Sequence, residues 1–482
     1  MPHPWYTLLA ISSLFGFWYT VFMKTQWKDK NIAIIGLGIE GVSSARYFKG
    51  EDCNVSILDR REKKDLDPVL VKEIEDLGVE LKLGTDYLSS LEDFQVVVRS
   101  PGVKKNIPEL IEAEKKGIFV TSQIKLFFDL CPGLIIGVTG TKGKGTTSTL
   151  IYEMLKKSGF DAYLGGNIGN PPFSFLSELN EQSRVVLELS SFQLQDLSKS
   201  PHIAVMLMIV PEHMDYHESL EEYVEAKRNI LRFQRPTDFA VVNRDYVPSL
   251  ESDVHTDGKV FYVSRERPST EQGCFVKDEA IWMRMEGAEW KIIDLADIKL
   301  PGKHNVENVS AAAMAATLAG TAKADIYEVL HTFEGLPHRL ELVREHEGVK
   351  YYDDSFSTTP ETAMAAIEAF TSPEVLILGG SSKNSDFTEL GRVITESRNI
   401  KAIIGIGVEW SRVKEAIDMH AKGVEPILMI EGARDMESVV AAASKIAKPG
   451  DVVILSPACA SFDMFKNYKE RGEKYKEEVL KL

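Results

Sequence analysis

Residues 134–148 read LIIGVTGTKGKGTTS, and this stretch decides the fold of the segment around it. A short apolar run leads into a glycine-rich loop, and the loop leads into a helical stretch. Strand, glycine loop and helix around a Gly-Lys pair are typical of a phosphate-binding loop, in which backbone N–H groups and the lysine hold phosphate oxygens. The loop is shorter than the usual one, because only Thr141 and Lys142 separate Gly140 from Gly143-Lys144.

The loop pattern assigns a role to each of its residues. Lys144 is expected to reach the β and γ phosphates, and the hydroxyl of Thr146 to approach Mg²⁺. The residues predicted to bind the nucleotide here are Gly140, Thr141, Lys142, Gly143, Lys144, Gly145 and Thr146.

Length and charge narrow the class of protein. A chain of 482 residues is too long for one core and indicates about three domains. The formal net charge of −16 and the lack of a long basic run argue against a nucleic-acid partner, which needs clustered lysine and arginine. The four scattered cysteines form no CxxC pair, so we expect reduced thiols in a cytoplasmic protein and no zinc site.

The amino terminus contains an uncharged stretch, WYTLLAISSLFGFWYTVFM, at residues 5–23. Its 19 residues are just enough to span a bilayer, and the lysines that follow would keep the body of the protein on the cytoplasmic side. Alternatively, translation starts at Met23, and the residues before it are not part of the protein. The sequence leaves both interpretations open, and contact with a membrane is expected only under the first.

Apolar strands alternate with helical stretches along the rest of the chain. This pattern predicts α/β domains with parallel sheets covered on both faces. Shifts in the pattern place the first domain at residues 24–120, the second at 121–335 and the third at 336–482, after the hydrophobic extension 1–23.

The first domain opens with a second glycine motif. Residues 36–41 read GLGIEG after an apolar strand, and Asp59 ends the next strand. This combination is typical of a dinucleotide-binding fold, although any nucleotide diphosphate can use the same helix N-terminus, and a tight turn without a ligand is the simplest alternative. Arg60 and Arg61 would suit a phosphate or a uracil carbonyl.

Two polar positions of the second domain lie at the ends of apolar strands. Glu188 lies inside VVLELS, where a buried carboxylate must be paired or bound to a cation. His213 and Asp215 follow the run AVMLMIV. Because ligands of open α/β sheets lie at the carboxyl ends of strands, we expect Glu188 and His213 near the phosphate loop. A structural ion pair of Glu188 and a structural role of His213 are the alternatives.

Lys227 is unusual within the helical stretch LEEYVEAKRNILRF. The helical period places it on the same face as Tyr223, Val224, Ile230 and Leu231. A lysine on an apolar face extends to solvent, pairs with an acid or loses its charge.

Several motifs occur together in an order that resembles the Mur ligases. They are GTKGKGTT, LELSSFQL, PEHMD, the EAK lysine, GKHNVENVSAA, GLPHR and SPACASFDMFKNYKERG, and the resemblance covers about residues 30 to 480. It is strongest to the branch that joins D-glutamate to UDP-N-acetylmuramoyl-L-alanine in peptidoglycan precursor synthesis. The resemblance implies ATP, Mg²⁺ and an acyl-phosphate intermediate. It also implies a Rossmann-like UDP-binding domain, a central phosphate-loop ATPase domain and a Rossmann-like third domain.

The resemblance implies further site residues. Glu188, His213 and Lys227 would be catalytic together with Lys144, and Lys227, as a carbamate, would bind Mg²⁺ with Glu188, His213 and Thr146. The implied nucleotide contacts are Asn305, Asn308, Arg339 and Asp354. The residues implied to bind the UDP-linked substrate are Gly38, Ile39, Asp59, Arg60, Arg61 and Asn167. The residues implied to bind the amino acid are Thr358, Lys383, Ser461, Phe462 and Tyr468.

This sequence departs from the family pattern at several positions. Residues 353–359 read DDSFSTT, where the family usually has DSKATN after the first residue, so Phe356 replaces a lysine that normally helps hold the substrate. Glu40 stands where a small polar residue is common. Gly145 and Tyr468 are milder changes, because serine or threonine and phenylalanine are usual there.

Three other functions are consistent with parts of the sequence. A ligase with another acceptor, such as L-glutamate, keeps the whole mechanism. An NAD-dependent oxidoreductase fits GLGIEG but leaves the phosphate loop unexplained. A non-ligating nucleotide-binding relative is favoured only by Phe356. We expect a monomer.

Overall fold

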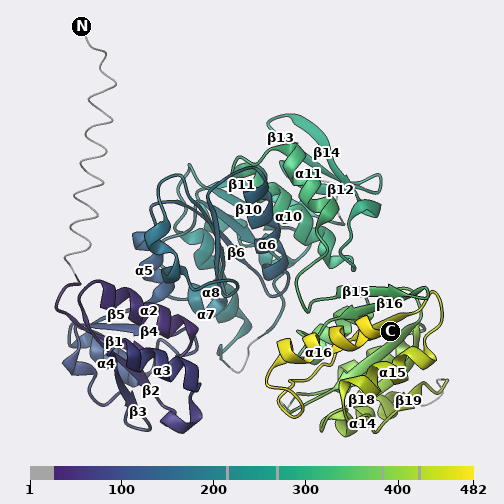
Figure 1. Ribbon diagram of the computed structural model, residues 1–482. Coiled ribbons are helices and arrows are strands. Elements are labelled where there is room, and N and C mark those ends of the chain that lie inside the picture. Colours follow the sequence, from purple (N-terminus) through teal and green to yellow (C-terminus); the bar gives the residue numbers. More distant parts are fainter. Residues whose placement is uncertain (1–26, 213–215, 267–270, 383–384, 422–424) are drawn as a thin grey trace. The chain divides into compact units, whose positions relative to one another are not determined.

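The computed structural model describes residues 27–212, 216–266, 271–382, 385–421 and 425–482. The strands of this part of the chain form three sheets (Figure 1). The chain divides into two compact units. One holds the residues up to Lys277 with Trp282–Trp290 and Ser310–Ile326, and the other holds Asp278–Ile281, Lys291–Val309 and Tyr327–Leu482.

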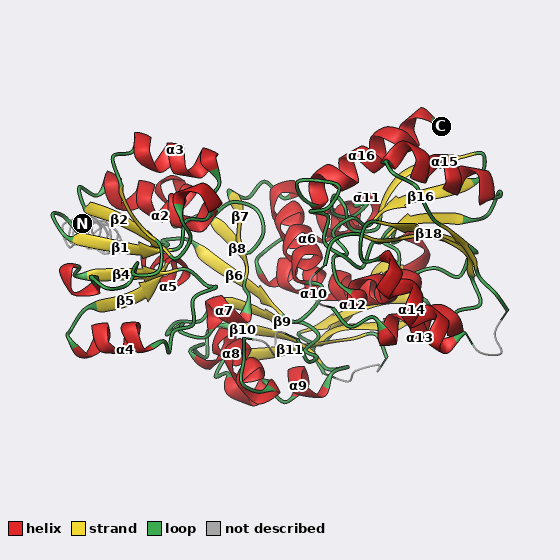
Figure 2. Ribbon diagram, turned by 90° about the horizontal axis from the view of Figure 1, so that it is seen from below, coloured by secondary structure: helices red, strands yellow, loops and turns green. Residues whose placement is uncertain are grey.

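The first sheet is parallel throughout, in the order β3-β2-β1-β4-β5 of a Rossmann-like fold. Ile32 and Ile34 enter one core and Ala33 and Ile35 the other, so both faces are buried beneath helices (Figure 2). The strands are β1 (Asn31–Ile35), β2 (Asn54–Asp59), β3 (Glu80–Leu83), β4 (Val96–Arg99) and β5 (Phe119–Ser122), and the helices are α2 (Ile39–Gly50), α3 (Pro68–Asp76), α4 (Pro108–Lys115) and α5 (Gln123–Leu130).

The second sheet has the order β14-β13-β12-β11-β10-β9-β6-β8-β7, with β6 between β9 and β8. All pairs from β12 to β7 are parallel. Its strands are β6 (Leu134–Thr139), β7 (Ala162–Gly166), β8 (Arg184–Glu188), β9 (Ile203–Met206), β10 (Phe239–Asn243), β11 (Lys259–Ser264), β12 (Gly273–Lys277), β13 (Ala280–Met285) and β14 (Ala288–Asp294). The helices are α6 (Lys144–Lys157), α7 (Ser191–Leu194), α8 (Leu220–Arg232), α9 (Val247–Leu250), α10 (His304–Leu318) and α11 (Lys323–Thr332).

Strand β9 is shorter than its apolar run suggests. The run continues to Val210, but the strand ends at Met206. Beyond that point the backbone turns to the phosphate loop, where the Met208 carbonyl accepts a hydrogen bond from the Thr141 amide at 2.6 Å. The apolar residues after Met206 are therefore part of the wall of the phosphate loop.

The third sheet has the order β15-β16-β20-β17-β18-β19 and is parallel except for the β15–β16 hairpin. Leu376 and Leu378 enter one core and Val375 and Ile377 the other. The strands are β15 (Glu341–His346), β16 (Val349–Asp353), β17 (Glu374–Gly379), β18 (Ile400–Ile406), β19 (Leu428–Ile430) and β20 (Val452–Leu455), and the helices are α12 (Pro360–Ile367), α13 (Thr388–Glu396), α14 (Trp410–His420), α15 (Met436–Ile446) and α16 (Tyr468–Lys481). The predicted fold class, three α/β domains, is confirmed.

No helix within the described residues is long and apolar enough to cross a membrane. The uncharged residues 5–23, on which the predicted anchor depends, lie outside this part of the chain. All four cysteines are free thiols, as expected.

Candidate active site

The phosphate loop connects β6 to α6 through two glycines with positive φ. Gly140 has a φ of 153° and Gly143 a φ of 84°. A Cβ atom on Gly140 would lie 2.8 Å from the Cβ atom of Leu207, so the loop needs glycine there. Helix α6 begins at Lys144, whose Nζ donates to the Gly140 carbonyl at 3.1 Å and the Thr141 carbonyl at 2.9 Å.

Thr141 fixes the loop to its surroundings. Its Oγ1 donates to the Val210 carbonyl at 2.9 Å and accepts from the Val210 amide at 3.0 Å. The hydroxyl of Tyr223, on α8, lies 3.0 Å from the same atom. Side-chain bonds of this kind hold a loop in one conformation, which suits a site that must be formed before its ligand binds.

Lys227 is buried under the phosphate loop. Its side chain is 1% exposed, and its Nζ donates to the Gly140 carbonyl at 2.9 Å and lies 4.5 Å from the centre of the Tyr223 ring. The prediction that it lies on the apolar face of α8 is confirmed, and it does not extend to solvent. Burial, and after it the charge of Lys144, lowers the pKa of Lys227 well below its usual value, against the opposing effect of Glu212 and Glu188.

Glu188 ends β8 beside the phosphate loop. It is buried, and its backbone pairs with that of Val138, on β6. Its Oε1 accepts a hydrogen bond from Asn167 Nδ2 at 2.8 Å, whereas its Oε2 is buried without a hydrogen-bond partner among the described residues. A buried carboxylate oxygen without a donor can serve as a ligand for a cation.

The predicted His213 and Lys383 lie outside the described residues, as does Asp215. Their neighbours are placed: Lys142 of the phosphate loop forms an ion pair with Glu212, at 2.5 Å.

Tyr223 and Glu212 belong to this site although the sequence did not single them out as site residues. Tyr223 lies four positions before Lys227, which is one turn away on the same helix face. That spacing was the available signal. For Glu212 the signal was its place in PEHMD, directly before His213.

The first domain brings Asp59 and Arg61 to its glycine motif. Asp59 accepts from the Leu37 amide at 2.9 Å and from the Arg61 guanidinium at 2.7 Å. Burial by itself would raise the pKa of Asp59, but the hydrogen bonds from Arg61 and Leu37 outweigh it and lower this pKa below its ordinary value. Gly38 precedes α2 as its N-cap, and Ile39 is exposed, so the helix N-terminus can receive a phosphate. Arg60 is exposed.

Glu40, in the first turn of α2, is held by the second domain. Its Oε1 accepts from Gln193 Nε2 at 3.2 Å. Burial raises the pKa of Glu40, against the hydrogen bond from Gln193 and the charge of Arg99. Glu40 is therefore easier to protonate than an exposed glutamate, and its protonated form would not repel an anion bound at the N-terminus of α2.

Asp354, Arg339 and Tyr468 lie close together in the second compact unit. Asp354 accepts from Ser456 Oγ at 2.7 Å and from the Leu340 amide at 3.1 Å. Burial raises its pKa to about 7, against hydrogen bonds from Ser357 and Ser456. The guanidinium of Arg339 stacks on Phe356, and Phe356 contacts Tyr468.

The other predicted residues of this unit are spread over two places. Thr358 is half-buried just before α12, Ser461 is buried and Phe462 is 72% exposed. Asn305 and Asn308 occupy the first turns of α10, where Asn308 Nδ2 donates to Asn305 Oδ1 at 2.9 Å.

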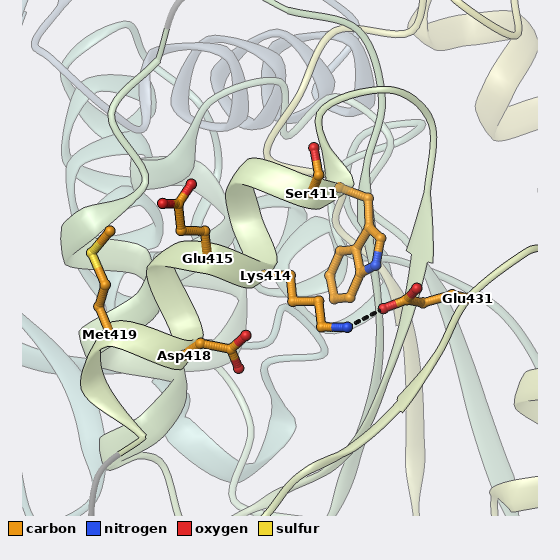
Figure 3. A pocket seen from close by; sticks show the side chains of 7 residues that line it. Ser411, Lys414, Glu415, Asp418, Met419 and Glu431 are labelled. Atoms are coloured by element: carbon orange, nitrogen blue, oxygen red, sulfur yellow. Dashed lines mark hydrogen bonds and ion pairs between the residues drawn. The ribbon is translucent and has the colours of Figure 1, made fainter.

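A pocket of about 670 Å³ lies apart from these residues (Figure 3). It runs along α14, where Lys414 forms an ion pair with Glu431 at 2.6 Å. None of the predicted site residues lines it. The lining residues are Trp410, Ser411, Lys414, Glu415, Asp418, Met419 and Glu431.

A three-domain α/β chain with a short phosphate loop, a buried lysine under it and a buried carboxylate beside it defines a nucleotide-dependent enzyme. Family models match along most of it: "Mur ligase MurD-like, N-terminal domain" at residues 30–122, "Mur ligase middle domain" at 138–316 and "Mur ligase, glutamate ligase domain" at 338–459. The chain belongs to the Mur ligase family, whose members are ATP-dependent ligases, and is MurD-like within it.

Curated relatives and solved structures agree with this family assignment. The chain is 40% identical over 458 residues to the UDP-N-acetylmuramoylalanine–D-glutamate ligase of Acetivibrio thermocellus, covering 95% of this chain and 97% of that relative. It is 40% identical over 455 residues to the ligase of the same name from Symbiobacterium thermophilum, covering 94% and 98%. Its fold is similar to that of UDP-N-acetylmuramate-alanine ligase MurC from Thermotoga maritima, with a TM-score of 0.57, 18% identity and coverage of 94% and 99%. MurF ligase from Thermotoga maritima in complex with ADP gives a TM-score of 0.54 at 17% identity, covering 95% and 97%.

Proposed function

We propose that this enzyme joins D-glutamate to UDP-N-acetylmuramoyl-L-alanine, with hydrolysis of ATP, in the synthesis of peptidoglycan precursors. The relatives that are 40% identical over almost the whole chain carry that activity in their names. The observation that carries the proposal at the site is the buried Lys227, whose Nζ lies 2.9 Å from the carbonyl oxygen of Gly140 in the phosphate loop. A lysine held there has no solvent-directed role, and its contact with the phosphate loop supports a part in the reaction of the bound nucleotide.

Residues of the phosphate loop bind and orient ATP in this proposal. The backbone N–H groups from Gly140 to Thr146 surround the phosphates, and Lys144 exchanges its carbonyl partners for phosphate oxygens. Asn305, Asn308, Arg339 and Asp354 contribute further nucleotide contacts. Positioning and charge neutralisation supply most of the catalysis in phosphoryl transfer.

Mg²⁺ fits the donors on this side of the sheet. The Oε2 atom of Glu188 has no hydrogen-bond partner in the part of the chain that the structure describes, and Asn167 holds its other oxygen. The low pKa of Lys227 favours a neutral amine, which is the form that can add carbon dioxide to become a carbamate. Glu188, the Lys227 carbamate, His213 and the hydroxyl of Thr146 would hold the ion, which supplies positive charge to the transferring phosphoryl group when bound.

The bonds change in two steps. The γ-phosphoryl of ATP passes to a carboxylate oxygen of the alanyl group, and ADP leaves. The amine nitrogen of D-glutamate then attacks the carbonyl carbon of this acyl phosphate. The bond from that carbon to the phosphate oxygen breaks, inorganic phosphate leaves, and the nitrogen loses a proton as the amide forms.

The first and third domains bind the two other substrates. Asp59, Arg60, Arg61, Gly38 and Ile39 bind the UDP group, and Asn167 lies by the muramoyl group. Thr358, Lys383, Ser461, Phe462 and Tyr468 bind D-glutamate. Such precursors are made in the cytoplasm, which is where we place the enzyme, as a monomer. A tether at residues 5–23 would face that compartment.

Phosphate release by the purified full-length chain tests the proposal. ATP, Mg²⁺ and UDP-N-acetylmuramoyl-L-alanine are supplied, and D-glutamate, L-glutamate and other amino acids are added one at a time. Release with D-glutamate is expected. Release with only another amino acid would retain the mechanism and change the acceptor. No release with any acceptor would favour a non-ligating relative. A change in NADH fluorescence on addition of the protein would instead favour the NAD-dependent oxidoreductase.

A further inference from the structure

Arg339 lies in a strained part of the backbone. The residues on either side of it, His338 and Leu340, have φ values of 63° and 46°. Bulky residues rarely adopt this left-handed region, and they keep it only where the surrounding structure enforces it. Backbone strain of this kind occurs preferentially at functional sites.

The last residue of β16 and the segment after it hold this conformation through three contacts. The His338 ring nitrogen Nδ1 lies 2.7 Å from Asp353 Oδ2, and the Leu340 amide donates to Asp354 Oδ1 at 3.1 Å. The Phe356 amide donates to the His338 carbonyl at 3.0 Å. Residues 353–356 therefore hold the backbone on both sides of Arg339.

The side chain of Arg339 is held by the same segment. Its guanidinium carbon lies 3.7 Å from the centre of the Phe356 ring. The same ring also contacts that of Tyr468, which is nearly perpendicular to it at a centre-to-centre distance of 5.1 Å. Phe356 is thus packed between a cation and an aromatic ring, an arrangement that restricts the orientation of the guanidinium.

We propose that Phe356 is a positioning residue that fixes the guanidinium of Arg339 for nucleotide binding. A guanidinium placed over a ring can make that contact with its flat face while its N–H groups donate in its plane, so a group held in this way can also bind a phosphate. A lysine at position 356 would place a second cation beside Arg339 instead of an aromatic ring. The departure of this chain from the family motif is therefore a different way of orienting Arg339, and the inference rests on the nucleotide-binding role given to Arg339 in the proposed function.

Calorimetric binding of a non-hydrolysable ATP analogue with Mg²⁺ to the full-length chain tests this, because it does not depend on turnover. Phe356→Leu is expected to weaken binding about fivefold, which is typical of losing a cation–π contact. Phe356→Tyr keeps the ring face and is expected to bind as the wild type does. Phe370→Leu is the matched control, because that half-buried ring packs on Tyr352 and no lysine or arginine of the described residues lies over it.

A double-mutant cycle with Arg339→Ala separates positioning from a general structural role. On the Arg339→Ala background, Phe356→Leu should cause no further loss of binding. An equal loss on both backgrounds, or unchanged binding by Phe356→Leu, would overturn the proposal. If the leucine variant does not fold, Phe356→Met fills the volume without a ring and provides the same comparison.

Steady-state constants then distinguish this inference from the proposed function. Phe356→Leu should raise KM for ATP more than KM for D-glutamate, and the opposite result would mean that Phe356 serves the acceptor. If the wild type forms no amide with any amino acid, the proposed function fails. The binding cycle still decides whether Phe356 positions Arg339.

Discussion

The environment of Lys227 defines the chemistry of its side chain. The side chain is buried, and its Nζ donates to the Gly140 carbonyl at 2.9 Å, which places the amine directly against the phosphate loop. Lys227→Ala is expected to reduce phosphate release at least about a hundredfold, since an electrostatic contact to the transferring group is lost. Measurement of release with and without added acetate or formate checks this.

Partial recovery of the Lys227→Ala variant by a small carboxylate is expected if the residue acts as a carbamate. Lys227→Arg is the matched control, because it keeps a cation but cannot form a carbamate, and it should stay inactive. Full activity of Lys227→Ala would contradict the role given to this residue.

Glu374, the first residue of β17, makes the stability of the protein depend on pH. It is fully buried, its Oε1 accepts from Asn399 Nδ2 at 2.5 Å, and its Oε2 has no hydrogen-bond partner among the described residues. Burial raises its pKa from 4.5 to about 8. The folded protein therefore holds a proton that the unfolded chain releases, so this residue causes the free energy of unfolding to fall as pH rises from 4.5 to 8.

Glu374→Gln removes this titration. Relative to the wild type, the variant should gain stability as pH rises, by at most about 1.4 kcal/mol per pH unit. Thermal unfolding at several pH values between 5 and 9 measures the difference. Exposed Glu361 provides the control, because Glu361→Gln should show no such trend. If the difference in stability between Glu374→Gln and the wild type did not change with pH, Glu374 would be ionised in the folded protein.

At the scale of elements, the phosphate loop depends on close packing against the segment after β9. Gly140→Ala would place a Cβ atom 2.8 Å from the Leu207 Cβ atom, at a φ of 153°. We expect a loss of about 1–3 kcal/mol in stability and weaker ATP binding. Chemical denaturation and calorimetry with the ATP analogue measure the two effects.

Gly50→Ala is the control for this substitution, because Gly50 ends α2 and a Cβ atom there would meet nothing within 4 Å. It should be neutral or slightly stabilising, since alanine favours helix more than glycine does. If Gly140→Ala behaved like Gly50→Ala, the loop would be less tightly packed than the geometry indicates.

At the scale of the whole molecule, a buried arginine connects the first two domains. Arg99, at the end of β4, is 1% exposed, and its guanidinium bonds Asp196 Oδ2 at 2.9 Å and the Phe192 carbonyl at 3.4 Å. Both partners lie beyond the first sheet, in or next to α7. Arg99→Met keeps the stem and removes the charge, and should cost about 2–3 kcal/mol, because Asp196 is left partly buried without its partner.

Differential scanning calorimetry is the measurement for Arg99→Met. We expect the unfolding of the first domain to separate from that of the second and to occur at lower temperature. Lys105→Met provides the control, because Lys105 is exposed and its bond to the Gln195 carbonyl crosses the same boundary. A single unchanged transition in Arg99→Met would show that the apolar contacts alone couple the two domains.

Much of the fold could be predicted because its signals are local. These signals are the glycines at the turn before α6, the apolar runs of strand length and the helical period around Lys227. Each depends on residues that are near one another in the chain, so the elements and the three-domain α/β class could be predicted from them. The same local signals overestimated β9, because an apolar residue in a loop wall looks like one in a strand.

The sequence by itself determined the phosphate loop, the strand ends that carry Glu188 and Asp59, and the position of Lys227 on the apolar face of its helix. Only the tertiary structure decided which atoms meet: Lys227 with the Gly140 carbonyl, Glu188 with Asn167, and Arg339 with Phe356. These pairs are separated by many residues along the chain, and no local pattern encodes a contact at such separation. The burial that changes the pKa of Lys227, Asp354 and Glu374 is likewise a property of packing, because it depends on how much water the surrounding elements exclude.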